Sequence, residues 1–296
     1  MSIQDYKDAG KIAAEVREKA RNTDHDGRTV LEVCESIESA ILDRGAKCAF
    51  PVNVSINETA AHYTAEPNDE MVIKEGDLVK LDMGAQINGY IADTAVTVCT
   101  DPRHVSLLDA AEDALKAAMS MIAEDVKSKD IGKTIERSIK NSGFKPIANL
   151  SGHSLDKYTI HAGKTIPNMW SLGSFSLKKD AAYACEPFVT YADGMGFVKE
   201  GKTKNIYSIS NRKKTKDAEA DRMLEYIWDN YNMLPFAERW LRKEWDKTRE
   251  LLQFLIKKKC VKAYPVLVEA NGKKVAQAEH TFIPQAGGVT VTTMYP

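Results

Sequence analysis

The chain has 296 residues, enough for one large domain or two ordinary ones, and its 43% hydrophobic and 28% charged content is typical of a globular protein. The formal net charge of −1 gives no general electrostatic case for binding nucleic acid or a membrane surface. No apolar run is long enough to span a membrane, no apolar signal segment follows Met1, and the five scattered cysteines form no CxxC pair, which favours reduced thiols and a cytoplasmic location.

The first elements in chain order are two helices and an extended stretch. Residues 3–21 carry an apolar stripe at helical spacing. Thr29 and Glu32 have the spacing of a capping box and predict the start of the second helix. Residues 48–56 then read as extended, and a polar loop that holds His62 follows them.

The strongest local signal is Asn88-Gly89 between two apolar runs, which predicts a hairpin with a type I′ turn. In that register Asp93 lies opposite Gly84, which is expected to leave open space. Asp82 then shares a face with Asp93, about 7–8 Å away on the diagonal. A pair of solvated surface acids is the ordinary interpretation. Because Asp is rare in strands, the alternative is that cations sit between the two carboxylates and cancel their repulsion.

The pattern after the hairpin indicates a second, similar half. Residues 105–126 predict a long helix, and Gly132 opens a shorter one that Gly143 closes. A helix in the first half is likewise flanked by Gly27 and Gly45. This weak internal similarity suggests two α+β halves packed around a shared sheet.

A charged, helical segment interrupts the second half. Helices are expected over residues 218–230 and 236–259, and strand-like sequence returns directly afterwards. We therefore expect an insertion subdomain at 206–263 and a catalytic domain formed by 1–205 with 264–296. Strands near the end of the chain carry the last acid of interest, Glu279.

Three further residues complete a set that suits metal ions. Glu186 and Glu279 lie in strand-like runs, and His153 lies between a glycine and a serine. Each alone could be an edge acid or a turn histidine, just as His62 and His161 could be core residues. Together with Asp82 and Asp93, however, the set offers one imidazole and four carboxylates on or beside short strands. That inventory fits two divalent transition-metal ions bridged by carboxylates.

The order of these five residues resembles the dinuclear site of the pita-bread metallopeptidases. Segments 60–64, 80–84, 152–154, 160–164 and 234–241 further resemble the type 2 methionine aminopeptidases, and the similarity spans essentially the whole chain. The helical insertion separates type 2 from type 1, and the lack of a long charged N-terminal extension is similar to the archaeal form. The resemblance implies an α+β pita-bread fold, with pseudo-two-fold halves around a curved antiparallel sheet and a helical insertion.

The resemblance also implies roles for the ligands. Asp82 would bind one ion, His153 and Glu186 the other, and Asp93 and Glu279 both. A hydroxide that bridges the ions would attack the scissile carbonyl, and Glu186 would shuttle the proton. The metal could be Co, Mn, Fe or Zn.

The remaining roles concern the substrate. One ion would bind its free α-amine, and His62 and His161 would hold the scissile carbonyl and the leaving amide. Both histidines are expected to have ordinary pKa values near 6.5. A slender apolar pocket for methionine would be lined by Phe50, Pro51, Ile56, Ile160 and His62, with the insertion as one wall. The substrates would be nascent polypeptides with an N-terminal methionine, preferably followed by a small residue.

Some details depart from the family pattern. Leu155-Asp156-Lys157 replaces a shorter glycine-containing spacer, Cys185 precedes Glu186 where isoleucine is usual, and the chain ends at Pro296. None of these changes removes a ligand. Cys185 and the C-terminal residues are the ones that could alter the pocket.

Two alternatives stay open. A prolidase or Xaa-Pro aminopeptidase would carry an additional N-terminal domain, for which the stretch before the hairpin leaves no room. A metal-free relative that binds RNA or protein would have lost ligands and would favour a basic surface. The basic runs 211–216 and 257–259 are expected on solvated faces of the insertion, where a ribosome contact is left open. We expect a monomer with no specific nucleic-acid partner and no membrane partner.

Overall fold

The computed structural model describes residues 2–295, so Met1 and the C-terminal Pro296 lie outside the described residues. The helices are α1 Ile3–Arg21, α2 Val30–Leu42, α3 Val105–Met121, α4 Ser128–Asn141, α5 Ala218–Tyr231, α6 Glu238–Leu241 and α7 Thr248–Lys257, with a short 3₁₀ turn at Pro102–His104. The strands of the first half are β1 Lys47–Cys48, β2 Asn53–Ile56, β3 Thr59–Ala61, β4 Val79–Ile87 and β5 Tyr90–Val98.

The later strands are β6 Lys145–Pro146, β7 Ser151–Leu155, β8 Thr165–Pro167, β9 Ala182–Cys185, β10 Phe188–Thr190, β11 Val198–Glu200, β12 Ile206–Ile209, β13 Phe236–Ala237, β14 Val261–Tyr264, β15 Leu267–Glu269, β16 Val275–Gln277, β17 His280–Gln285 and β18 Gly288–Val291. Among the described residues, no helix is both long enough and apolar enough to cross a membrane.

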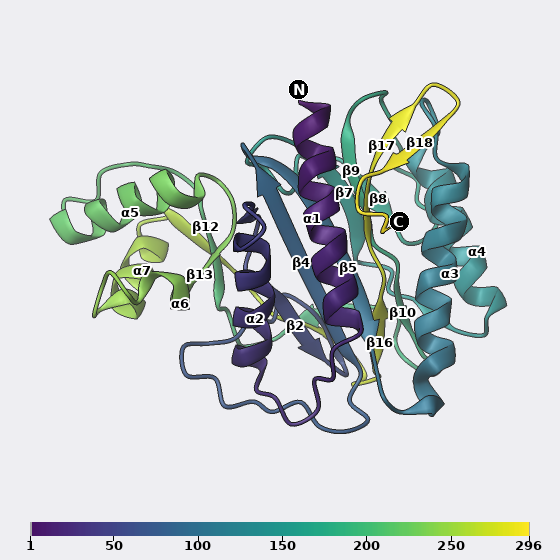
Figure 1. The fold of residues 1–296 in the computed structure, drawn as a ribbon, viewed down its shortest axis with the longest axis horizontal. Coiled ribbons are helices and arrows are strands. Elements are labelled where there is room, and N and C mark those ends of the chain that lie inside the picture. The colour runs from purple at the N-terminus through teal and green to yellow at the C-terminus, as the bar shows by residue number, and fades with distance from the viewer. Residues whose placement is uncertain (1, 296) are drawn as a thin grey trace.

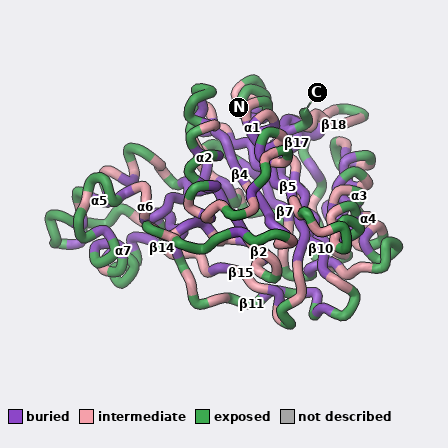
Figure 2. The backbone as a smooth tube through the Cα atoms, turned by 60° about the horizontal axis from the view of Figure 1, so that its bottom comes forward, coloured by how far each residue is buried: buried purple, intermediate pink, exposed green. Residues whose placement is uncertain are grey.

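Helices α1 and α2 cover one face of the sheet that contains β1, β2, β4 and β5 (Figure 1). Their apolar faces join that sheet in one buried cluster. The expected helix 3–21 is confirmed, and Thr29 and Glu32 form the expected capping box. Figure 2 shows the buried backbone running through β4 and β5, beneath helices whose outer sides are exposed.

The hairpin has the predicted register. Gly84 pairs with Asp93, and both turn residues have positive φ, 53° at Asn88 and 88° at Gly89. One expectation is wrong: Gly84 does not face open space, because a Cβ there would overlap the aromatic ring of Phe50. The glycine therefore lets the Phe50 ring lie directly against the strand.

Helices α3 and α4 cover the second half, whose main sheet has the strand order β18-β17-β9-β7-β8. Helix α3 ends at Met121 rather than near 126, because Ile122 takes an extended conformation. Helix α4 begins at Ser128, so the expectation that Gly132 opens it is wrong. Gly132 instead lies inside the helix, where a Cβ would collide with the Met169 carbonyl oxygen.

The segment with α5, α6 and α7 extends to one side of the molecule, next to α2 (Figure 1). Its helices and the sheet β13-β12-β14 share a separate apolar cluster. The expected single helix over 236–259 is wrong, because the chain forms β13, α6 and α7 there. The buried Glu238 carboxylate binds Arg242 and Arg249, each at 3.0 Å, and the Arg249 pair joins α6 to α7.

Candidate metal centre

The five expected ligands come together from five places in the chain. Asp82 lies on β4, Asp93 on β5 and His153 on β7, whereas Glu186 follows β9 and Glu279 precedes β17. All five line one cavity of about 370 Å³. Glu279 also makes an isolated antiparallel bridge with Ala95, which joins the sheets of the two halves at this point.

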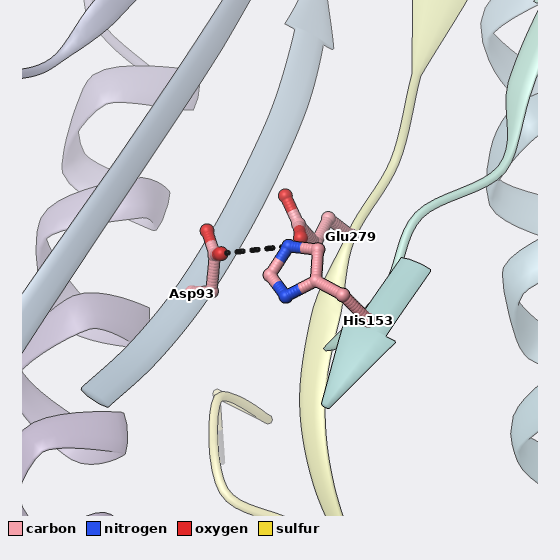
Figure 3. A group of neighbouring side chains, drawn as sticks. All are labelled: Asp93, His153 and Glu279. Atoms are coloured by element: carbon pink, nitrogen blue, oxygen red, sulfur yellow. Dashed lines mark ion pairs between the residues drawn. The ribbon is translucent and has the colours of Figure 1, made fainter. Parts of the chain in front are cut away.

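Three of the ligands already converge (Figure 3). One ligand atom each from Asp93, His153 and Glu279 lies within 4.8 Å of the other two. The His153 Nε2 atom lies 3.6 Å from Asp93 Oδ2 and 3.6 Å from Glu186 Oε1. Asp93 is 3% exposed and Glu279 2% exposed, so a bound cation would be largely screened from solvent.

Threonine side chains fix the strands that carry the ligands. The Thr94 hydroxyl donates to the Glu279 carbonyl over 2.8 Å. Thr281 bonds the backbone of Asp93, and Thr97 bonds the backbone of Gln277. These bonds cross between β5 and the strands β16 and β17, whose backbones are joined in the described residues by the isolated bridge of Ala95 with Glu279. The ligand geometry is therefore built into the junction of the halves.

The electrostatics of the cluster favour cations. Burial raises the pKa of Asp82 to about 7, and burial together with the neighbouring carboxylates raises the pKa of Asp93, Glu186 and Glu279 well above the ordinary range. Asp82 Oδ1 and Glu279 Oε1 are buried without a hydrogen-bond partner among the described residues. Divalent ions would satisfy these oxygens and cancel the repulsion, so the donor set fits them.

The two further histidines lie at the same cavity. His62 follows β3, and its Nδ1 lies 3.2 Å from the Pro265 carbonyl oxygen, to which a neutral ring donates. The His161 ring centroid lies 4.4 Å from that of His153. The expected pKa near 6.5 is wrong for both. Burial lowers the pKa of His62. Partial loss of hydration, with a smaller contribution from the nearby Lys262 cation, lowers the pKa of the exposed His161 to about 4.

The residues expected to line a methionine pocket lie in different places. Phe50 and Ile160 line the cavity, as expected, but Pro51 and Ile56 are not among its lining residues in the described chain. Ile56 packs instead against the core beneath α1 and α2. Strand alternation explains this, because Asn53 faces the cavity beside Asp82 and Ile56 must then point to the other face.

Sequence reasoning missed several residues at the site. Asn53 and Phe188 line the cavity, and so do Ile206, Pro235 and Tyr264 from in and around the insertion. Asn53 could have been predicted, because β2 pairs with the hairpin strand β4 and places Asn53 opposite Asp82. No local sequence signal indicates that the other residues lie at the cavity. Of the departures from the family pattern, Cys185 is fully buried in the second core and does not line the cavity, while Met294 and Tyr295 are about half exposed.

Comparisons with known proteins show which family the chain resembles. The sequence model of metallopeptidase family M24 matches residues 4–211. The methionine aminopeptidase of Saccharolobus solfataricus is 42% identical over 289 residues, which cover 96% of this chain and 95% of that protein. The methionine aminopeptidase of Methanocaldococcus jannaschii is also 42% identical, with 99% of this chain and 100% of that protein covered.

Solved structures share the fold at low sequence identity. A methionine aminopeptidase from Thermotoga maritima has a TM-score of 0.71 at 22% identity, with 100% of this chain and 98% of that chain covered. A thermophilic Arx1 has a TM-score of 0.85 at 17% identity, and the match covers 100% of this chain and 92% of that one. A prolidase from Pyrococcus furiosus has a TM-score of 0.64 at 16% identity, and the match covers 99% of this chain but 64% of that one.

Proposed function

The chain belongs to metallopeptidase family M24, and we propose that its buried cluster of one histidine and four carboxylates is the catalytic centre of a methionine aminopeptidase. The protein is a metal-dependent hydrolase that removes methionine from the N-terminus of peptides. The observation that carries the assignment of the centre is the convergence of Asp93, His153 and Glu279 beside Asp82 and Glu186 in one cavity.

We assign the cluster to two divalent ions, of cobalt, manganese, iron or zinc. Asp82 would hold one ion, His153 and Glu186 the other, and Asp93 and Glu279 both. Ions bound there would activate water, because a bound metal ion lowers the pKa of water from about 15.7 towards about 7. This donor set suits several divalent metals, so availability decides which is bound as much as affinity does.

The chain's own residues do the remaining work. The Glu186 side chain is 14% exposed at the cavity, a position from which its carboxylate can accept the proton of the attacking water and pass it to the leaving amine. His62 and His161, kept neutral by their lowered pKa values, can donate or accept hydrogen bonds at the scissile carbonyl and the leaving amide. Anchoring the free α-amine at the centre restricts cleavage to the first residue.

The cavity supports a preference for a slender apolar side chain. Phe50, Ile160 and Phe188 provide apolar surface, and Ile206 and Tyr264 close the side next to the insertion. One methylene more or less discriminates by only about 1–3 kcal/mol in such a pocket. Norleucine should therefore be accepted nearly as well as methionine, and polar or branched residues should be rejected. A small second residue is the proposed preference at the next position.

We further propose that the enzyme is of type 2, with an insertion subdomain at 206–263 and a catalytic domain at 1–205 with 264–296. The separate apolar cluster of the insertion supports this division. The position of the insertion beside the cavity also supports this division, because Ile206 and Tyr264, at the two boundaries of the insertion, both line the cavity.

The insertion also carries the surface that we propose for a ribosome contact. The lysines and arginine of 211–216 and 257–259 are exposed, and the two runs lie side by side, because Ser210 N donates to the Cys260 carbonyl over 2.7 Å. Replacing Lys213 and Lys258 by Glu should weaken cosedimentation with ribosomes without changing peptide hydrolysis. We also propose that the enzyme acts as a monomer on nascent chains in the cytoplasm.

The deciding experiment is hydrolysis by chelated protein before and after addition of Co²⁺ or Mn²⁺. Met-Ala-Ser should release methionine only with metal, and Asp93→Ala should abolish this. Cleavage of Ala-Pro-Ala alone would instead place the enzyme with the Xaa-Pro peptidases. No turnover with any metal would favour a role in binding only.

A further inference from the structure

Gln277 brings one amide group to two of the five ligands. It is 1% exposed and precedes Glu279 by two residues at the end of β16. Its Nε2 atom lies 3.4 Å from Glu186 Oε2 and 3.4 Å from Glu279 Oε2. Among the residues that the structure describes, no other side-chain hydrogen-bond donor reaches the carboxylate of Glu186 or of Glu279.

The backbone of Gln277 is held firmly in this place. The Thr97 hydroxyl donates to the Gln277 carbonyl over 2.7 Å and accepts from the Gln277 N–H over 2.8 Å. Gln277 also pairs with Phe188 on β10, the strand that begins two residues after Glu186. Buried Lys80 fixes the start of β16 by donating to the Val275 carbonyl over 2.8 Å. The backbone from which the Gln277 side chain extends is therefore fixed next to the two carboxylates.

The contacts divide the two oxygens of Glu186 between different partners. Oε1 lies 3.6 Å from His153 Nε2, on the side where the ligand atoms converge, whereas Oε2 points to the Gln277 amide. A carboxylate with one oxygen hydrogen-bonded can rotate less freely, so its other oxygen keeps its direction. Glu279 has the same division, since Oε2 meets the amide and Oε1 is left without a partner.

The amide of Gln277 is uncharged, and this matters for metal binding as much as its position does. A lysine or arginine among these carboxylates would form ion pairs and cancel part of the negative charge that attracts divalent ions. An amide supplies N–H donors and leaves all four carboxylate charges available. Glutamine is therefore suited to order the cluster without competing with a metal.

We propose that Gln277 is a positioning residue, whose amide turns the metal-facing oxygens of Glu186 and Glu279 toward the ions and keeps Glu186 in the orientation needed for proton transfer. The inference rests on the proposed metal centre. Because Gln277 does not line the cavity, its role concerns the ligands and not the recognition of the substrate side chain.

The test is Gln277→Met, which keeps an unbranched side chain of similar length and removes the donors. Titration of the chelated protein with Mn²⁺ in a calorimeter should give binding about 10–100-fold weaker than in the wild type. At saturating Mn²⁺, kcat for Met-Ala-Ser should stay about tenfold lower, because Glu186 is no longer held, while KM stays within about twofold.

A second pair of variants separates positioning from general stability. Thr97→Val releases the backbone of Gln277 and should also weaken Mn²⁺ binding. Thr190→Val is the matched control, because it removes a buried bond of 2.9 Å to the Lys274 carbonyl on the same segment without touching Gln277. It should lower the melting temperature and leave Mn²⁺ affinity unchanged.

The outcomes are distinguishable. Wild-type Mn²⁺ affinity and kcat in Gln277→Met would overturn the positioning role while leaving the peptidase assignment intact. If that variant does not fold, equal Mn²⁺ affinity in Thr97→Val and Thr190→Val would overturn it instead. Failure of the wild-type protein to bind Mn²⁺ or release methionine would count against the proposed function itself.

Discussion

Thr281 holds the backbone of Asp93 with both functions of one hydroxyl group. Its Oγ1 accepts from the Asp93 N–H over 2.7 Å and donates to the Asp93 carbonyl over 2.8 Å. Asp93 belongs to the hairpin of the first half and Thr281 to β17 of the second, and Thr281 is fully buried. One side chain thus replaces the backbone ladder that is missing where the two sheets meet.

Removing that hydroxyl should weaken both the fold and the metal centre. Thr281→Val leaves the Asp93 N–H and carbonyl buried and unpaired, which should destabilise the protein by about 1–3 kcal/mol. Urea unfolding measures this change, and Mn²⁺ titration should give a lower affinity in parallel. Thr281→Ser, which retains the hydroxyl, should lie close to the wild type. Equal losses in both variants would mean that the methyl group and not the hydroxyl matters.

Metal removal should lower thermal stability. Ions that bind only the folded cluster stabilise it by mass action, by about 2.7 kcal/mol when the free metal concentration is 100 times the dissociation constant. The melting temperature of chelated protein should therefore rise with added Mn²⁺. Asp93→Ala should remove most of this rise, because Asp93 belongs to the convergent group of ligands. A rise of the same size in the variant would mean that the metal binds elsewhere.

The metal-free protein should lose stability as pH rises through the range in which the cluster ionises. Burial raises the pKa of Asp82 from its ordinary 3.8 to about 7. A carboxylate with a raised pKa in the folded state gives its full stability below the unfolded value, and this stability is lost as pH rises through the folded value. The metal-free protein should therefore lose this stability between about pH 4 and about pH 7.

Urea unfolding of chelated wild type and chelated Asp82→Asn across this window measures that effect. The stability of the variant relative to the wild type should increase with pH, since the asparagine cannot ionise. Parallel curves would contradict the buried, repulsive cluster.

A side chain at position 84 should narrow the substrate cavity. The Cβ of Gly84→Ala would overlap the Phe50 ring, which lines the cavity, and would also touch the Ala49 Cβ at 3.0 Å. The ring should move, so KM for Met-Ala-Ser should rise more than kcat falls, with a loss of stability of about 1–3 kcal/mol from overpacking. Adding Phe50→Leu should recover part of both losses. An unchanged KM would show that the ring can yield in another direction.

The insertion should depend on Glu38 of α2. This carboxylate accepts hydrogen bonds from Arg239 and, over 2.9 Å, from the Trp240 indole. Glu38→Ala leaves the Arg239 guanidinium buried without its partner, which should cost about 3–5 kcal/mol in urea unfolding. Glu35→Ala is the matched control on the exposed side of the same helix and should stay within about 0.5 kcal/mol.

The local parts of the fold were predictable because their signals are local. Asn88-Gly89 determined the turn, and the turn determined the register of Asp93 against Gly84. Thr29 with Glu32 determined the start of α2. In each case a backbone conformation or a side-chain cap within a few residues decides the structure, so no distant contact is needed to read it.

The errors occur where distant contacts decide. Gly132 looks like a helix start, but it is glycine because the Met169 carbonyl approaches the helix there. The segment expected as one helix over 236–259 forms separate elements, and one contact between them is the ion pair of Glu238 on α6 with Arg249 on α7. Gln277 was not singled out, since nothing in its neighbourhood in the sequence indicates that Glu186 would lie beside it.

The bridge between Ala95 and Glu279 has a consequence for how the protein is made. Asp82 and Asp93 leave the ribosome early, but their partner Glu279 follows only after the second half and the insertion have been synthesised. Contacts so distant in sequence form late in folding. During most of its synthesis the nascent chain therefore contains Asp82 and Asp93 without Glu279. It becomes able to bind metal only when β16 and β17 have packed against β5.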